Sequence, residues 1–114
     1  MKSASVMLYR VFRLGPAERI PVGEGRTFAV GGNQVAVFRT RTGGVYATQA
    51  ECPHRKGPLA EGLLGGSAVA CPFHGFKFDL ATGAPVGHDC GALRTFRVEL
   101  DASGELLLYL EGSR

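Results

Sequence analysis

Apolar and polar side chains alternate along much of this chain with the two-residue period of a strand that is buried on one face. Near the C-terminus Phe96, Val98 and Leu100 occupy every second position, with polar residues between them. After a turn, Leu106 and Leu108 begin another run on one face. Helical periodicity is hard to find anywhere in the sequence. The pattern therefore predicts an all-β fold.

Eight short strands are predicted from runs of β-branched and aromatic residues separated by glycine-rich or polar turns. They cover Val6–Phe12, Thr27–Val30, Gln34–Thr40, Gly44–Thr48, Ala68–Cys71, Phe76–Asp79, Thr95–Leu100 and Glu105–Leu110. One short helical turn is expected within Gly15–Gly25, and Gly62–Gly66 is expected to form a turn. Short strands at this spacing favour an antiparallel β-sandwich or barrel.

Length and composition indicate one globular unit. The chain has 114 residues, of which 45% are hydrophobic and 20% charged, so we expect a single domain over residues 1–114 and exclude intrinsic disorder. The 17 glycines have no three-residue period. They therefore indicate many tight turns and not a collagen helix.

Charge and hydropathy exclude two classes of partner. The net charge of +3 comes from scattered basic residues, with only Arg55 and Lys56 adjacent, so nucleic acid is not an expected ligand. No apolar run approaches the roughly 18 residues of a membrane span, and Val6–Tyr9 is too short for a signal-peptide core. A cytoplasmic location is therefore predicted. The three cysteines should be reduced there, so a metal or catalysis explains them better than disulfides do.

Two short motifs combine cysteine with histidine: C-P-H at residues 52–54 and C-P-F-H at residues 71–74. Each motif follows a predicted strand and enters a loop stiffened by proline and glycine. Short spacing lets both side chains of one loop converge on a single metal centre, while the sheet fixes the ends of the loop. We therefore predict a metal site whose ligands are Cys52, His54, Cys71 and His74.

The arrangement of the ligands bears on the identity of the metal. Two cysteines and two histidines also form a structural zinc set, so a zinc-binding interaction module is one interpretation. In the common zinc layout, however, one segment supplies both cysteines and the other both histidines, whereas each loop here supplies one of each. This mixed layout suits two adjacent irons. The C-x-H…C-x-x-H-G signature resembles the Rieske iron–sulfur family, in which two histidines replace two cysteines on one iron of a [2Fe–2S] centre.

The resemblance implies one [2Fe–2S] cluster per chain, with Cys52 and Cys71 on one iron and His54 and His74 on the other. It also implies a β-sandwich base and a small cluster-binding subdomain formed by two loops, at about residues 51–86. The implied function is one-electron transfer. Two ferric ions, two sulfides and two thiolates sum to zero charge, and one added electron makes the centre −1.

Residues near the motifs resemble the soluble branch of the family. Membrane respiratory Rieske proteins have two further cysteines, joined in a disulfide, where this chain has Gly57 and Phe73. They also have a serine and a tyrosine that donate hydrogen bonds to the cluster, where this chain has Phe76 and Phe78. Loss of those donors predicts a reduction potential near the low end of the Rieske range. Gly57 and Gly75 are expected to let backbone N–H groups approach the sulfurs.

Two soluble kinds of Rieske protein fit the remaining sequence. Ile20–Arg26 and Asp89–Phe96 look more like the small subunit of cytoplasmic NAD(P)H nitrite reductase, which we favour. That resemblance implies a large partner subunit carrying sirohaem and flavin, which reduces nitrite to ammonia in nitrate assimilation. The alternative is the ferredoxin component of a ring-hydroxylating dioxygenase system, whose partners are the dioxygenase and its reductase. No nucleotide-binding motif is found in this chain, so it is not expected to be catalytic alone.

Four residues near the motifs have simpler interpretations. His88 is expected to be a solvated loop residue, and Cys90 a buried small apolar residue or an unreactive thiol. Arg55 and Lys56 form either a solvated loop tip or a docking site for a partner, and the sequence leaves both alternatives open.

Overall fold

The structure is a computed structural model, and it describes residues 9–53, 56–73 and 75–111. The described chain forms two antiparallel sheets, of six and four strands, with two short 3₁₀ turns. The predicted all-β fold is confirmed. No helix in the described ranges is long and apolar enough to cross a membrane.

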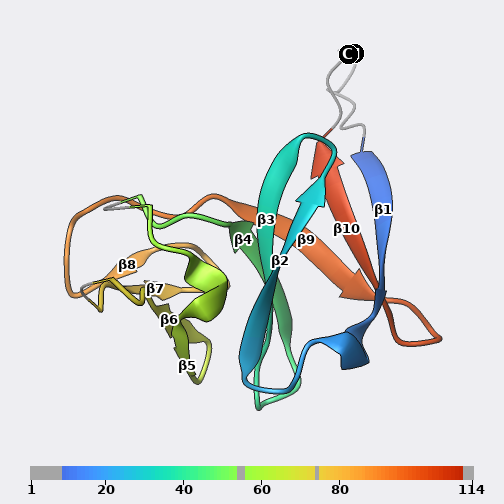
Figure 1. Cartoon of the computed structure of the whole chain (residues 1–114), viewed down its shortest axis with the longest axis horizontal. Coiled ribbons are helices and arrows are strands. Elements are labelled where there is room, and N and C mark those ends of the chain that lie inside the picture. Colours follow the sequence, from blue (N-terminus) through green and yellow to red (C-terminus); the bar gives the residue numbers. More distant parts are fainter. Residues whose placement is uncertain (1–8, 54–55, 74, 112–114) are drawn as a thin grey trace, which may run out of the picture.

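The larger sheet has the strand order β1-β10-β9-β4-β3-β2 (Figure 1). Its strands are β1 (Tyr9–Pro16), β2 (Glu24–Val30), β3 (Asn33–Arg39), β4 (Val45–Gln49), β9 (Thr95–Leu100) and β10 (Glu105–Glu111). The sheet curls, so that its two ends share one core. At Gly31, after β2, an added Cβ would lie 3.2 Å from both the Leu110 side chain and the Phe12 ring.

The core of the larger sheet follows the predicted alternation. On β10, Leu106, Leu108 and Leu110 are buried, and the residues between them are only partly covered. Side chains from β3, β4 and the turn η1 (Ala17–Arg19) complete this first core. Its buried members are Ala17, Ile20, Val30, Val35, Val37, Ala47, Leu106, Leu108 and Leu110.

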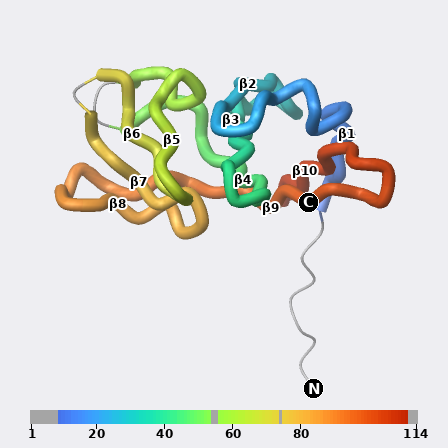
Figure 2. Tube along the Cα trace, turned by 90° about the horizontal axis from the view of Figure 1, so that it is seen from below, coloured from blue at the N-terminus to red at the C-terminus, as the bar shows by residue number. Residues whose placement is uncertain are grey.

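The smaller sheet has the order β5-β6-β7-β8 and lies beside the larger one (Figure 2). Its strands are β5 (Leu63–Gly65), β6 (Ala68–Ala70), β7 (Lys77–Asp79) and β8 (Pro85–Val86). One row of paired residues faces inward onto a second core. The buried members of that core are Ala36, Phe38, Cys52, Leu59, Val69, Cys71, Phe78, Leu80 and Leu93.

Strand β3 is buried on both faces. Val35 and Val37 belong to the first core, whereas Ala36 and Phe38 belong to the second. All four side chains are 0% exposed. The apolar run in this strand therefore serves two cores, and β3 is the wall that they share.

The structure differs from the prediction at three strands. Strand β1 covers Tyr9–Pro16 instead of Val6–Phe12, and residues 6–8 lie outside the described ranges. It continues past Phe12 because the pairing with β10 shifts register between Arg13 and Gly15, where Gly15 adopts a φ of 97°. Strand β5 lies inside the stretch predicted as a turn, and β8 was not predicted. With three and two residues, these strands are too short to show a period.

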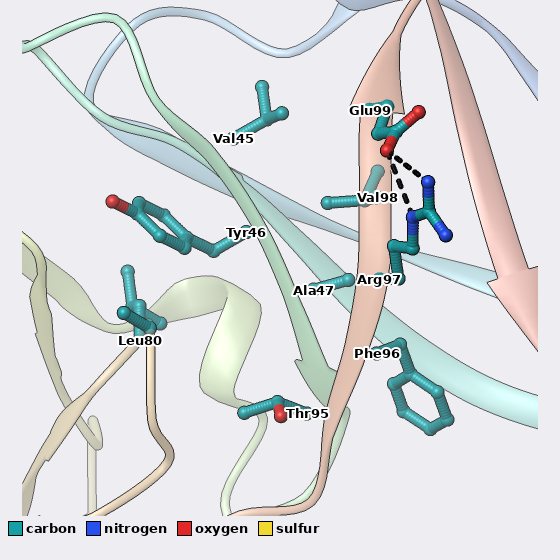
Figure 3. Close-up of a pocket in the computed structure, with 10 residues that line it drawn as sticks. Val45, Tyr46, Ala47, Leu80, Thr95, Phe96, Arg97, Val98 and Glu99 are labelled. Atoms are coloured by element: carbon teal, nitrogen blue, oxygen red, sulfur yellow. Dashed lines mark hydrogen bonds and ion pairs between the residues drawn. The ribbon is translucent and has the colours of Figure 1, made fainter.

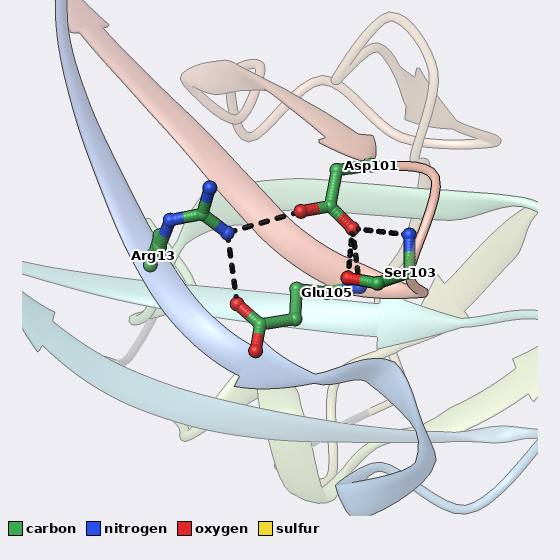
Figure 4. Close-up of polar contacts among 4 residues, drawn as sticks. All are labelled: Arg13, Asp101, Ser103 and Glu105. Atoms are coloured by element: carbon green, nitrogen blue, oxygen red, sulfur yellow. Dashed lines mark hydrogen bonds and ion pairs between the residues drawn. The ribbon is translucent and has the colours of Figure 1, made fainter.

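A polar network fixes the turn between β9 and β10 (Figure 4). The Asp101 carboxylate accepts hydrogen bonds from the backbone N–H groups of Ser103 and Glu105 and from the Ser103 hydroxyl. Arg13 of β1 donates to Asp101 at 3.0 Å and to Glu105 at 2.9 Å. These hydrogen bonds, the one from Glu105 above all, hold the pKa of Asp101 well below its usual value.

Leucine truncation tests the assignment of the first core. Leu108 is 0% exposed and Leu63 is 80% exposed, and both lie on strands. Leu108→Ala should lower the free energy of unfolding by about 2–5 kcal/mol because it removes buried apolar surface and leaves a cavity. Leu63→Ala should change it by no more than about 0.5 kcal/mol. Urea unfolding of both variants measures the difference, and equal losses would contradict this core.

Asp101→Asn tests the turn through the pH dependence of stability. The pKa of Asp101 is lower in the folded protein than in the unfolded chain, where it is about 3.9. The Asp101 carboxylate therefore stabilises the fold above about pH 3.9, and this stabilisation is lost as the pH falls through the folded pKa. The wild type should therefore exceed Asp101→Asn in Tm at pH 7, and the gap should narrow in acid. Asp89→Asn removes the same charge from an exposed loop position and is the control. A gap that stays constant below pH 4 would contradict the network.

Candidate metal centre

The first cysteine loop leaves β4 and returns to the 3₁₀ turn η2 (Leu59–Glu61). The Cys52 N–H donates to the Gly57 carbonyl at 2.9 Å, and the Lys56 N–H donates to the Cys52 carbonyl at 2.8 Å. A further bond joins the Leu59 N–H to the Ala50 carbonyl at 2.9 Å, next to the bridge between Glu51 and Pro58. The loop is thus closed at its base, and Cys52 is only 1% exposed.

The second cysteine loop follows β6 and repeats this hydrogen-bond pattern. The Cys71 N–H donates to the Phe76 carbonyl at 2.7 Å, and the Gly75 N–H donates to the Cys71 carbonyl at 3.1 Å. In both loops the cysteine therefore bonds to the residues four and five positions later. Cys71 is 2% exposed. The two cysteines are therefore held by the same pattern of backbone hydrogen bonds.

The fourth position after each cysteine adopts a left-handed backbone conformation. Gly75 has a φ of 69°, and Lys56, at the equivalent position of the first loop, has a φ of 58°. Among the described residues Lys56 is the only non-glycine with positive φ. Glycine adopts this conformation without strain, whereas a residue with a Cβ pays a cost of roughly 1–2 kcal/mol. The first loop therefore carries strain at Lys56 that the second loop avoids.

Gly57 allows the two loops to touch. A Cβ at this position would lie 2.7 Å from the Cys71 Sγ and 3.1 Å from the Phe73 ring. The backbone of Gly57 therefore lies close to the Cys71 sulfur, while the approach of its N–H to a sulfur stays a prediction. At Gly75 an added Cβ would meet none of the described residues within 4 Å, and the feature that favours glycine here is the left-handed conformation.

Cys52 and Cys71 lie in the same buried core, and burial raises the pKa of Cys71. A hydrogen bond from the Phe73 N–H to the sulfur opposes that shift, while the neighbouring Cys52 and Cys90 thiols add to it. Two buried thiols in one core favour a shared cation, because a positive charge offsets the cost of ionising them. This donor set fits an iron–sulfur centre. The sequence does not predict this hydrogen bond from Phe73 to the Cys71 sulfur, because every residue except proline has a backbone N–H and the pattern of side chains does not show which one donates.

The structure brings Cys52 and Cys71 together, while His54, Arg55 and His74 lie outside the described residues. The residues beside these positions are exposed, including Lys56 and Phe73, which is 48% exposed. Both loops therefore have buried cysteines at their bases and surface residues near their tips.

A third segment, residues 87–93 after β8, packs on the second core near the cysteines. The expectation that His88 is solvated is wrong: it is half-buried and stacks on the Phe76 ring. Cys90 is only partly buried against the second core, whereas a buried residue is one of the two expectations for it. Burial raises its pKa, and the nearby Cys52 and Asp89 add to the effect.

A groove of about 390 Å³ lies away from the cysteine loops, between β4, β9 and the turn that follows β7 (Figure 3). Tyr46 and Leu80 line it, and Arg97 donates two hydrogen bonds to Glu99 at its rim, at 2.7 and 2.9 Å. The charges of this pair are satisfied by each other, so the remaining polar side chains of the lining are those of Tyr46 and Thr95.

Comparison with known proteins places these features in a family. The model of the Rieske [2Fe–2S] domain matches residues 10–97. Ferredoxin CarAc of Metapseudomonas resinovorans is 38% identical over 90 residues, which are 78% of this chain and 80% of that protein. The chain matches 4β-methylsterol monooxygenase of Methylococcus capsulatus with 37% identity over 65 residues, 56% of this chain, but spans only 18% of that oxygenase.

Solved structures have the same fold. A candidate NADH-dependent nitrite reductase small subunit from Mycobacterium tuberculosis superimposes with a TM-score of 0.86 and 18% identity, over 93% of this chain and 99% of that one. A protein described as the small subunit of nitrite reductase NADPH gives a TM-score of 0.78 and 26% identity, over 87% and 97%. The family match covers most of the chain, including both cysteine loops. The chain therefore belongs to the Rieske [2Fe–2S] domain family.

Proposed function

We propose that this protein carries single electrons on a [2Fe–2S] cluster held by Cys52, His54, Cys71 and His74. The observation that carries the proposal is the pair of matching loops, which bury two cysteines in the same core. With two thiolates on one iron and two neutral imidazoles on the other, the cluster would change from zero charge to −1 on reduction. The buried cysteines and the aromatic residues around them limit the access of water to that charge.

For its setting, we propose the small subunit of an NAD(P)H nitrite reductase, whose large subunit would carry sirohaem and flavin. The stretches Ile20–Arg26 and Asp89–Phe96 support this assignment, as does the 26% identity to a solved small subunit. The second candidate is the ferredoxin of an oxygenase system, which is favoured by the 38% identity to CarAc.

Reconstitution separates the two settings. The chemically reduced protein is mixed with the oxidised sirohaem subunit encoded in the same genome, or with a ring-hydroxylating oxygenase, and reoxidation of the cluster is followed by stopped-flow absorbance. Fast, saturable reoxidation by the sirohaem subunit alone supports the first setting. The same result with the oxygenase alone supports the second.

Metal and sulfide analysis tests the cluster itself. The purified protein should contain about two irons and two acid-labile sulfides per chain. His54→Ala, His74→Ala and Cys71→Ser should each lose the iron and lower the Tm, because metal binding and folding are coupled. Cys90→Ser should keep the cluster, since Cys90 is not one of the proposed ligands. Stoichiometric zinc without labile sulfide after anaerobic preparation would instead support a structural zinc module.

Lys56 variants separate backbone strain from charge. Lys56→Gly should be more stable than Lys56→Ala by about 1 kcal/mol, because only glycine adopts the positive φ freely. If the exposed ammonium meets an acidic partner, both variants should transfer electrons more slowly than the wild type and with a weaker dependence on salt. Wild-type rates at every ionic strength would place docking elsewhere, while the stability order would still report the strain.

A further inference from the structure

His88 makes three contacts that tie residues 87–93 to β7 and to Phe76 just before it, and one contact within its own segment. Its Nε2 lies 2.8 Å from the Lys77 carbonyl oxygen, and the Cys90 N–H donates to its Nδ1 at 3.2 Å. Its ring stacks on Phe76 with the centroids 4.7 Å apart and the planes at 27°. The edge-on ring of Phe78 lies 5.0 Å away at 83°.

The two hydrogen bonds require that one ring nitrogen of His88 carries a hydrogen and that the other does not. A carbonyl oxygen can only accept, so Nε2 must carry the hydrogen that Lys77 receives. A backbone N–H can only donate, so Nδ1 must be free to accept from Cys90. One neutral tautomer satisfies both bonds. Each ring nitrogen of His88 therefore has a partner in the protein, whereas the nitrogens of a solvated histidine would bond to water.

Three of the residues that His88 contacts lie next to the cysteines or in the core that contains them. Phe76 is held to Cys71 by the 2.7 Å bond between the Cys71 N–H and the Phe76 carbonyl. Phe78 is 0% exposed and lies in the same buried core as Cys52 and Cys71. Cys90 packs against that core, close enough for Cys52 to affect its pKa. His88 thus contacts the second loop through Phe76 and is bonded within its own segment to Cys90.

The third segment has few other attachments. After the short strand β8, Gly87 and Gly91 adopt positive φ angles, and residues 87–92 are exposed or only partly covered. The next anchor is Leu93, which is 4% exposed and whose N–H donates to the Gly83 carbonyl at 2.7 Å. His88 is therefore the main anchor in the middle of the segment.

We propose that His88 is a positioning residue for the iron–sulfur cluster. Its contacts hold Phe76 and the third segment in place beside the two cysteine loops, where they shield the sulfurs from water. The inference rests on the proposed cluster and adds a residue outside the four ligands. Without His88 the segment would move away, and water would reach the sulfurs. Water stabilises the extra negative charge of the reduced cluster, so the reduction potential should rise.

Three substitutions divide the contacts of His88. His88→Ala removes all four, His88→Phe keeps an aromatic ring against Phe76 but neither hydrogen bond, and His88→Gln keeps a donor for the Lys77 carbonyl. Val86→Ala is the control, because it shortens a 47% exposed side chain on the adjoining strand and changes no charge. Each holoprotein is measured for cluster loss in EDTA, for its potential by protein-film voltammetry and for the EPR spectrum of the reduced state.

His88→Ala should lose the cluster about tenfold faster than the wild type, as is usual when a group supporting the ligands is removed. Its potential should be higher and its EPR spectrum altered, with His88→Phe and His88→Gln between it and the wild type. If His88→Ala does not fold, these two variants carry the test. Cluster loss, potential and EPR equal to those of Val86→Ala, with only a lower Tm, would overturn the proposal. A wild-type protein without iron and labile sulfide would instead overturn the proposed function.

Discussion

Burial of β3 on both faces is the constraint on which the rest of the molecule depends. The strand gives Val35 and Val37 to the core of the larger sheet and Ala36 and Phe38 to the core that contains both cysteines. Gly25 on β2 preserves this contact, because a Cβ there would lie 2.7 Å from the Phe38 ring and 3.2 Å from the Ala60 backbone. The base of the first cysteine loop is therefore fixed by the same packing that joins the two cores.

The cysteine loops meet because each is closed by its own backbone before the two come together. In both, the cysteine bonds to the residues four and five positions later, which leaves the intervening residues at the tip. Gly57 then brings the first loop against the sulfur of Cys71. The backbone hydrogen bonds of each loop thus fix the position of its cysteine relative to the strand that precedes it. The hydrogen bonds around Lys56 hold its backbone in the strained left-handed conformation.

The aromatic residues around the second core have a role besides filling space. Phe78 is fully buried, and Phe76 connects the backbone of Cys71 to the ring of His88. The family resemblance implies that respiratory Rieske proteins have hydroxyl donors at these two positions. Among the described residues, the backbone N–H of Phe73 is a donor to the Cys71 sulfur. Apolar surroundings of this kind disfavour the extra charge of a reduced cluster, which is the physical reason for the low potential that the sequence predicts.

The sequence by itself determined the all-β class and the long strands, because two-residue alternation is a local property of the chain. The spacing of C-P-H and C-P-F-H is local too, and the four ligands that it predicts stay a prediction. It could not reveal β5 and β8, which are too short to have a period and form only by pairing with β6 and β7. Only the tertiary structure decided that Gly57 touches Cys71 and that His88 is held between Lys77 and Cys90. Those contacts join residues from separate loops, and the packing of two sheets around β3 brings the loops together.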